Sequence, residues 1–151
     1  MDFKKLANQY KDELLDNVLP FWLKNSQDHE YGGYFTCLDR EGKVFDTDKF
    51  VWLQGREVWM FSMLYNKIEK RQEWLDCAIQ GGEFLKKYGH DGNYNWYFSL
   101  DRSGRPLVEP YNIFSYTFAT MAFGQLSLAT GNQEYADIAK KTFDIILSKV
   151  D

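Results

Sequence analysis

Residues 35–43, FTCLDREGK, recur 62 positions later as residues 97–105, YFSLDRSGR. In both copies a leucine, an aspartate and an arginine precede a glycine at the same spacing, and a basic residue follows it. Alternating aromatic residues beside a glycine turn are typical of a short β-hairpin. We therefore predict one hairpin within residues 31–46 and a second within residues 95–110. Self-similarity at a fixed period indicates a repeat protein, whose units bury their apolar faces against one another.

The segments around the two hairpins have helical spacing of two kinds. Residues 3–24, 72–88 and 134–150 carry apolar side chains along one side, as amphipathic helices do. Residues 50–68 are apolar around nearly the whole circumference, and residues 111–132 contain no charged side chain. Such segments are predicted to be buried helices. The chain thus runs outer helix, hairpin, inner helix, and then repeats this order.

Alternation of amphipathic and fully buried helices predicts two concentric layers. The expected fold is therefore all-α, an α/α toroid or (α/α)6 barrel with short β-hairpins between outer and inner helices. A closed ring of six helix pairs would need roughly 370 residues at this repeat length, and this chain supplies about two and a half units. We expect an incomplete barrel with an apolar flank left uncovered. Pro110 predicts the start of the second inner helix.

Composition argues against several classes of protein. The chain is 44% apolar and 26% charged, as soluble globular proteins are, and its net charge of −4 comes without a basic block. Neither nucleic acid nor a membrane is therefore an expected partner. Two distant cysteines, Cys37 and Cys77, and the absence of a signal-peptide core predict a cytoplasmic location. Metal-ligand clusters, phosphate-binding loops and nucleophile elbows are not recognisable, so no metal is expected.

Arg56 stands in the otherwise apolar segment VWLQGREVWM, residues 51–60. Residues three and four apart share a helix face, so Arg56 would lie between Trp52 and Trp59. One interpretation is a structural arginine paired with a buried carboxylate or with helix-end carbonyl groups. The other is a cavity residue near the helix start, whose guanidinium donates hydrogen bonds to sugar oxygens and stabilises developing negative charge.

The 62-residue offset aligns Trp52 with Phe114 and Arg56 with Phe118. Aromatic rings beside a hydroxyl suit the apolar face and polar rim of a sugar, and they would equally suit a plain core. The matching face of the second inner helix carries Tyr111, Phe114, Ser115 and Phe118.

A pair of carboxylates, as glycosidases need, is not indicated. Glu57 points about 100° away from the preceding residue around the helix. Asp39 and Asp101 are each expected to bond the backbone of their own turn. His29 and His90 lie in loops beside glycines, and we expect both to be solvated surface residues.

Three stretches resemble a known family: YGGYFTCLDREGKV (31–44), FVWLQGREVWMF (50–61) and IFSYTFATMAFGQLSLATG (113–131). In this order they resemble the N-terminal part of the N-acylglucosamine 2-epimerase family, also called the renin-binding protein family. The resemblance covers essentially the whole chain, and the family fold is an (α/α)6 barrel. It implies that residues 1–151 are the N-terminal part of a single, truncated barrel domain.

The resemblance implies an isomerase that interconverts N-acylglucosamine and N-acylmannosamine at C2, with two histidines removing and returning the proton. Arg56 matches a family arginine that holds the sugar oxygens and the enolate-like intermediate, so we expect it to be catalytic. Trp52 matches a cavity aromatic, and Ser115 falls where related isomerases place a substrate-contacting tyrosine. Neither His29 nor His90 matches the catalytic histidines, which belong to the C-terminal part of the family. We therefore expect this chain alone to be inactive.

The resemblance also implies an amino sugar as the small-molecule ligand and a homodimer as an assembly. No cofactor is required, although ATP activates some members. Two alternatives stay open. One is a related enzyme, either an aldose–ketose isomerase or a cellobiose 2-epimerase, and the other is a non-catalytic module that binds a sugar or a protein.

Overall fold

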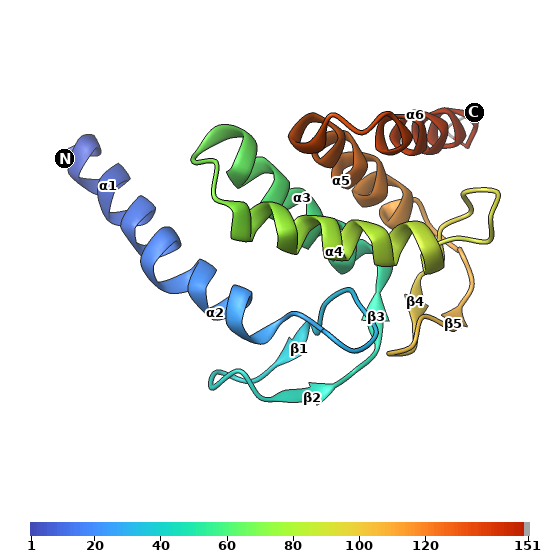
Figure 1. Cartoon of the computed structure of the whole chain (residues 1–151), viewed down its shortest axis with the longest axis horizontal. Helices are drawn as coiled ribbons and strands as arrows, with labels where there is room; N and C mark the ends of the chain where they lie inside the picture. The colour runs from blue at the N-terminus through green and yellow to red at the C-terminus, as the bar shows by residue number, and fades with distance from the viewer. Residues whose placement is uncertain (150–151) are drawn as a thin grey trace.

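The computed structural model describes residues 1–149, so the end of the last predicted helix, at Val150, lies outside the described residues. Helices and hairpins follow one another in the order that the repeat predicts (Figure 1). The first outer segment is one continuous helical rod with a π-helical turn in its middle: α1 (Phe3–Glu13), η1 (Leu14–Val18) and α2 (Leu19–Asn25). The inner helices are α3 (Val51–Lys67) and α5 (Phe114–Thr130), and the other outer helices are α4 (Gln72–Tyr88) and α6 (Gln133–Ser148).

Both predicted hairpins are present. The five strands are β1 (Cys37–Leu38), β2 (Val44–Asp46), β3 (Lys49–Phe50), β4 (Ser99–Leu100) and β5 (Pro106–Val108). The glycine of each turn has a positive φ, +85° at Gly42 and +94° at Gly104, which other residues adopt only with strain. Strand β3 was not predicted. It pairs antiparallel with β4 and thereby joins the two repeats through one three-stranded sheet.

The two repeated aspartates close their own turns, as predicted. Asp39 Oδ1 accepts a hydrogen bond from the backbone N–H of Lys43 at 2.7 Å. Asp101 Oδ1 accepts the equivalent bond from the N–H of Arg105 at 2.9 Å. Each carboxylate therefore serves its turn and is not paired with a second carboxylate for catalysis.

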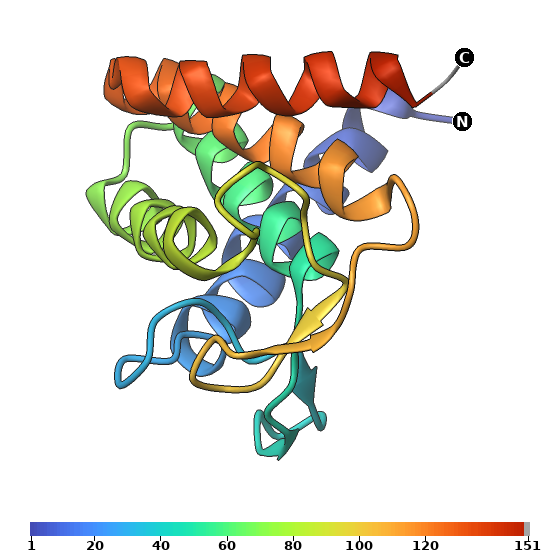
Figure 2. The ribbon, with the colours of Figure 1, turned by 90° about the vertical axis from the view of Figure 1, so that its right-hand side faces the viewer.

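The inner helices α3 and α5 lie side by side, with α4 and α6 packed outside them (Figure 2). Their close approach depends on Gly55, where an added Cβ would be 3.0 Å from the backbone carbonyl of Phe118. On α4, Gly81 makes room for the buried ring of Tyr34, which an added Cβ would overlap. Gly55 therefore sets the spacing of α3 and α5, and Gly81 lets Tyr34 pack against α4, which offsets the low helix propensity of these two residues.

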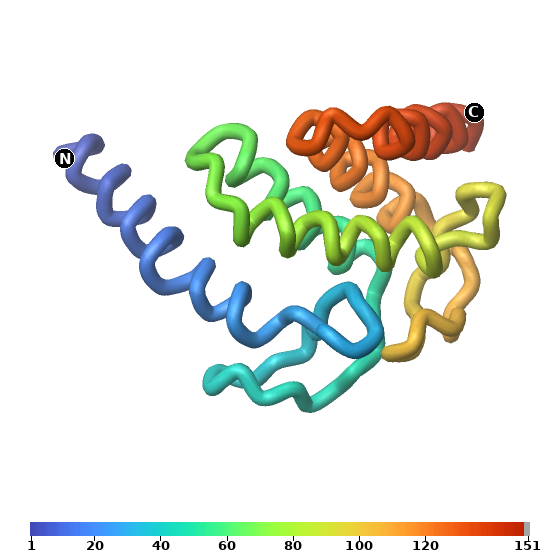
Figure 3. The backbone as a smooth tube through the Cα atoms, viewed as in Figure 1, coloured from blue at the N-terminus to red at the C-terminus, as the bar shows by residue number. Residues whose placement is uncertain are grey.

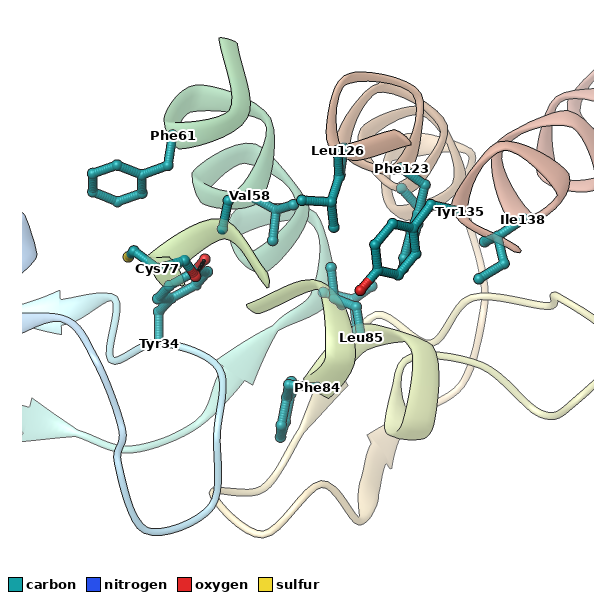
Figure 4. Close-up of a cluster of buried hydrophobic side chains, with 14 of the residues drawn as sticks. Tyr34, Val58, Phe61, Cys77, Phe84, Leu85, Phe123, Leu126, Tyr135 and Ile138 are labelled. Atoms are coloured by element: carbon teal, nitrogen blue, oxygen red, sulfur yellow. Dashed lines mark hydrogen bonds between the residues drawn. The ribbon is translucent and has the colours of Figure 1, made fainter. Parts of the chain in front are cut away.

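A core of buried side chains fills the space between these helices (Figure 4). Tyr34 is fully buried in this core, and its hydroxyl donates a hydrogen bond to the carbonyl oxygen of Cys77 at 2.7 Å. The amide of Gln54 binds both backbone groups of Tyr34 at 2.8 Å. The first repeat is thus locked onto both α3 and α4. The other labelled core residues are Val58, Phe61, Phe84, Leu85, Phe123, Leu126, Tyr135 and Ile138.

The prediction that the inner helices are buried all round is wrong for the described residues. On α5, Phe114, Met121 and Leu128 repeat every seven residues and are exposed, because no element within residues 1–149 covers that face. On α3, Arg56 is exposed and Trp59 is only partly buried. Each inner helix has neighbours on some sides and an uncovered flank on another.

The first outer rod likewise stands apart from the helix layers along most of its length (Figure 3). Within α1 no residue is buried, and Phe3 and Tyr10 are 73% and 70% exposed. Contact with the rest of the fold begins near Leu15, which is partly buried and packs against the core, and Leu19 is 1% exposed. The amphipathic pattern therefore predicted the helix correctly, although its apolar side is not covered within the described chain.

The second inner helix begins at Phe114, three residues later than predicted. Its first turn is not built on Pro110. Instead, the Asn112 side chain accepts a hydrogen bond from the N–H of Phe114 at 3.0 Å. The N-cap residue itself is Ile113, and the Asn112 side chain satisfies the first N–H of the helix, which has no partner within the helix.

Candidate active site around Arg56

The start of α3 is fixed by the sheet that joins the two repeats. Phe50 has an extended backbone at the helix boundary, and the N–H of Val51 donates to the carbonyl oxygen of Phe98 at 3.0 Å. The first free N–H of the helix is therefore held by strand geometry. This places Trp52 and Arg56, one turn apart, at the end of α3 where the hairpins gather.

A buried ion pair lies next to this end of α3, directly before the helix in the chain. The ammonium of Lys49, 0% exposed, donates to Asp28 Oδ2 at 3.0 Å and to the carbonyl oxygens of Gly32 and Arg102 at 2.6 and 2.8 Å. All three N–H groups of the lysine therefore have acceptors. Arg102, from the second hairpin, also binds Asp28, at 2.9 Å.

The carboxyl of Asp28 is accordingly a stable anion. Burial alone would raise its pKa, but the hydrogen bonds from Arg102 and Lys49 outweigh burial and lower the pKa to about 2. Burial lowers the pKa of Lys49, although the bond to Asp28 opposes this. The loop after α2, strand β3 and the second hairpin are thus tied together by charge as well as by the sheet.

The side chain of Arg56 is exposed, and it forms no hydrogen bond or ion pair with any other residue of 1–149. The described chain therefore does not supply the buried carboxylate that a purely structural arginine would need. A guanidinium with unused donors is available to a ligand.

A cavity of about 380 Å³ lies beside Arg56 on the flank of α3. Four of its lining side chains are apolar or aromatic, which suits a small organic ligand, and a few are polar. The cavity lies between α3, the end of α2 and the start of the first hairpin. Its lining residues are Trp22, Thr36, Leu53, Arg56, Glu57, Trp59 and Met60.

Glu57 is the ionisable residue of α3 that is buried, with 8% of its surface exposed. Burial raises its pKa to about 8. The carboxyl is therefore uncharged at neutral pH and does not neutralise Arg56. The angle of about 100° between Arg56 and Glu57 around the helix does not keep Glu57 out of the site, because the cavity extends around the flank of α3 and reaches both residues.

The aromatic residues expected at the cavity form two contacts at the same end of the helices. Trp52 packs against Phe118, with ring centroids 5.8 Å apart. Tyr111 packs against Phe98 at 4.9 Å. Phe114 and Tyr111 are 61% and 67% exposed. The structure thus brings Trp52 and Phe118 together and leaves Tyr111 and Phe114 at the surface beyond them.

Ser115 has a different environment from its neighbours. It is 2% exposed, one helix position and about 100° away from Phe114. It does not line the cavity beside Arg56. A role of Ser115 in binding a substrate stays a prediction.

The two histidines do not join this site. His29 is exposed, as expected. His90 is partly buried, so the expectation of a solvated residue is wrong for it: its ring stacks on Tyr94 at 4.7 Å and contacts Trp96 at 4.9 Å. Burial lowers the pKa of His90. Neither histidine lines the cavity.

Sequence reasoning missed Trp22, Thr36 and Glu57 as cavity residues. For Glu57 a signal was available, because Gln54, Glu57, Phe61 and Leu64 are spaced three, four and three apart and all four are buried. Trp22 and Thr36 come from other elements, and no local pattern could have placed them against α3. Among residues 1–149, no group of three or more metal-ligating side chains is close enough to hold a metal ion.

A family model described as N-acylglucosamine 2-epimerase matches residues 33–151. The chain belongs to the N-acylglucosamine 2-epimerase family. The N-acylglucosamine 2-epimerase of Mus musculus is 45% identical over 140 residues, which are 90% of this chain and 33% of that protein. The enzyme of Bos taurus is 46% identical over 140 residues, again 90% of this chain and 33% of that protein. This member of the epimerase family thus spans about a third of the length of these relatives.

A solved structure confirms the barrel architecture for this epimerase-family chain. The cellobiose 2-epimerase of Bacillus thermoamylovorans B4167 superposes with a TM-score of 0.86 at 30% identity, over 95% of this chain and 37% of that one. The helices therefore form part of an (α/α)6 barrel, as the repeat predicted. Within the described residues, no helix has both the length and the apolarity needed to cross a membrane.

Proposed function

We propose that this chain contributes the arginine side of the active site of an N-acylglucosamine 2-epimerase, which interconverts N-acylglucosamine and N-acylmannosamine. The observation that carries the proposal is an unpaired arginine beside a cavity of about 380 Å³, in a chain 45% identical to N-acylglucosamine 2-epimerases. The family resemblance suggests the reaction, and the exposure of Arg56 beside the cavity supports its proposed role.

In this reaction the open-chain sugar loses the proton at C2, which is α to the C1 carbonyl. Negative charge then develops on O1 as the enolate forms. The Arg56 guanidinium would bind this oxygen through its fork of N–H donors and stabilise the charge. Because Glu57 is uncharged, the positive charge of Arg56 is not cancelled within the cavity.

We assign the proton-transferring groups to no residue of this chain. General acid–base catalysis requires a group within hydrogen-bond reach of C2, and neither His29 nor His90 lines the cavity. The chain alone is therefore expected to bind sugar without turnover, and epimerisation is proposed for the full-length protein.

The aromatic residues are proposed to shape the rest of the sugar site. Trp52 and Phe118, already in contact, present rings on which the apolar face of a sugar packs. Tyr111 and Phe114 would extend this surface, and Ser115 is retained as a substrate contact by resemblance alone. No cofactor is proposed as required, and ATP activation, a homodimer and a cytoplasmic location stay predictions.

A cellobiose 2-epimerase is the second candidate, favoured by the structural match at 30% identity. Substrate choice separates the two. The full-length protein is incubated in D₂O with N-acetylmannosamine, cellobiose or mannose, and loss of the C2 proton signal is followed by NMR. Exchange with N-acetylmannosamine alone is the expected result. Exchange with cellobiose alone would overturn the N-acyl assignment, and exchange with none would overturn the epimerase proposal.

Arg56 is tested in the same assay. Arg56→Ala should lower kcat/KM by roughly a hundredfold to a thousandfold, as removal of an oxyanion-stabilising donor does elsewhere. Arg40→Ala, which changes the exposed arginine of the first hairpin turn, is the matched control and should leave the rate unchanged. Retained activity in Arg56→Ala would remove this residue from the site.

A further inference from the structure

The Glu57 carboxyl occupies an unusual position, buried in the wall of the cavity and next in sequence to Arg56. Oε1 lies 2.5 Å from the hydroxyl oxygen of Ser26. The same hydroxyl lies 2.7 Å from the carbonyl oxygen of Trp22. A carbonyl oxygen can only accept, so the single hydrogen of Ser26 belongs to the bond with Trp22. The proton between Ser26 and Glu57 must then come from Glu57.

This arrangement fixes the role of each carboxyl oxygen. Oε1 carries the proton and donates it to Ser26, which leaves Oε2 as a carbonyl-type acceptor. No residue of 1–149 forms a hydrogen bond with Oε2. Since Glu57 lines the cavity and keeps 8% of its surface exposed, the unused acceptor is available to whatever occupies the cavity.

The rest of the wall is mostly apolar. Trp22, Leu53, Trp59 and Met60 line the cavity beside Glu57. A ligand group that fits here needs one hydrogen-bond donor for Glu57 and a small apolar body for these side chains. A sugar hydroxyl supplies only the donor, and the ammonium of an unacylated amino sugar would be poorly solvated beside a neutral carboxyl.

We propose that Glu57 is a specificity-determining residue that accepts a hydrogen bond from the amide N–H of the sugar's 2-acylamino group, with the acyl group packed against Trp22, Leu53, Trp59 and Met60. This assignment rests on the proposed function and adds to it a reason why an N-acyl sugar is preferred over a plain one. Arg56, at the rim of the same cavity, would then hold the oxygens nearer C1.

The experiment compares two pairs of ligands on the full-length protein. Binding of N-acetylmannosamine and mannose, and of N-acetylglucosamine and glucose, is measured by isothermal titration calorimetry at pH 7. Glu57→Leu should weaken binding of the N-acetyl sugars roughly threefold to tenfold, as loss of one neutral hydrogen bond does, and leave binding of mannose and glucose within about twofold. The preference for N-acyl sugars should therefore fall.

Glu57→Gln should restore the N-acyl preference that Glu57→Leu loses, a result that a merely structural role of Glu57 would not require. Its amide donates to Ser26 and presents an acceptor oxygen in place of Oε2. The N-acyl preference should therefore remain within about twofold of the wild-type value. This variant also covers the case in which Glu57→Leu fails to fold. Glu41→Gln, in the exposed first turn, is the control for a glutamate outside the cavity.

The pH dependence gives a second measurement. The titratable groups facing Glu57 are Arg56 on its own helix, Tyr34 from the loop after α2 and Cys77 on α4. Burial raises the pKa of Tyr34 and of Cys77, so both stay neutral between pH 6 and about 9. Above about pH 8 the ionised Glu57 still accepts a hydrogen bond through Oε2, and a charged acceptor forms the stronger bond. The N-acyl preference of the wild type should therefore rise as pH rises through about 8, whereas that of Glu57→Gln should not change.

The outcomes separate this inference from the proposed function. If the wild type neither binds nor epimerises an N-acyl sugar, the proposed function fails. If the wild type prefers N-acyl sugars but Glu57→Leu keeps the same preference, or Glu57→Gln loses it while folded, only the assignment of Glu57 is overturned.

Discussion

Glu57 Oε1 lies 2.5 Å from Ser26 Oγ, although the two residues are 31 positions apart in the chain. This contact joins the end of α2 to the middle of α3 at the wall of the candidate site. It requires a protonated carboxyl, because the Ser26 hydroxyl already donates to the carbonyl oxygen of Trp22 at 2.7 Å. A residue that would ordinarily be an anion is thus part of the neutral core.

Replacing Glu57 should change how stability depends on pH. Burial raises the Glu57 pKa from 4.5 to about 8 in the folded state. Between these values the unfolded chain has lost the proton and the folded chain keeps it, so stability falls as pH rises, by up to about 1.4 kcal/mol per pH unit. Glu57→Gln should remove this slope. Urea unfolding of both proteins at pH 5, 6.5 and 8 measures it, and parallel curves would contradict the assignment.

Asp28 should make stability depend on pH in a separate, acidic range. Its pKa is lowered from 3.8 to about 2, so its contribution is complete above about pH 4 and is lost as pH falls through 2. Asp28→Asn should therefore flatten the loss of stability between pH 4 and pH 2. It should leave the slope between pH 5 and pH 8 unchanged. Acid titration followed by circular dichroism distinguishes the two ranges.

Removing the buried lysine should be severe. Lys49→Met takes away an ammonium that is 0% exposed and leaves Asp28 buried with only Arg102 as a charged partner. Breaking a buried pair in this way costs about 3 to 5 kcal/mol. The matched control is Arg105→Ala, which removes an exposed ion pair with Asp101 and should cost less than about 1 kcal/mol. Equal effects of the two changes in denaturant unfolding would refute a structural role for Lys49.

Three glycine-to-alanine changes should have different effects. Gly81→Ala would overlap Tyr34, whose hydroxyl is held by Cys77, so it should destabilise by about 2 kcal/mol or more. Gly55→Ala would press on the Phe118 backbone at 3.0 Å and separate α3 from α5, which should also lower stability. At Gly124 nothing lies within 4 Å, so Gly124→Ala should stabilise by up to about 1 kcal/mol. Thermal melting of the three variants tests this order.

Much of the architecture could be predicted from the chain alone. The LDR-x-G repeat at residues 38–42 and 100–104 predicted both hairpins, and the change in apolar spacing around them predicted the alternation of outer and inner helices. These features depend on neighbours within one or two turns. Helix ends were less predictable, as the start of α5 at Phe114 shows, because Pro110 and the Asn112 side chain are both local signals for a helix start and lie only two positions apart.

The site was predicted only in part. Arg56 was singled out because a charge in an apolar helix is visible as a local exception. The cavity itself was not predictable, because Trp22 and Thr36 reach it from α2 and from the first hairpin. His90 was misjudged because its burial depends on how its own loop folds Tyr94 and Trp96 against the ring.

The sequence by itself determined which segments form helices, how these segments repeat, and that α3 carries two adjacent ionisable residues, Arg56 and Glu57. Only the tertiary structure decided that Arg56 is exposed beside the cavity while Glu57 is buried and protonated in its wall. Periodicity places a side chain on a face of its own helix, but it does not say what packs against that face. Here Ser26 and the loop around Tyr34 pack against that face. They bury Glu57 and leave it a single hydrogen-bond partner, and this environment sets the charge of its carboxyl.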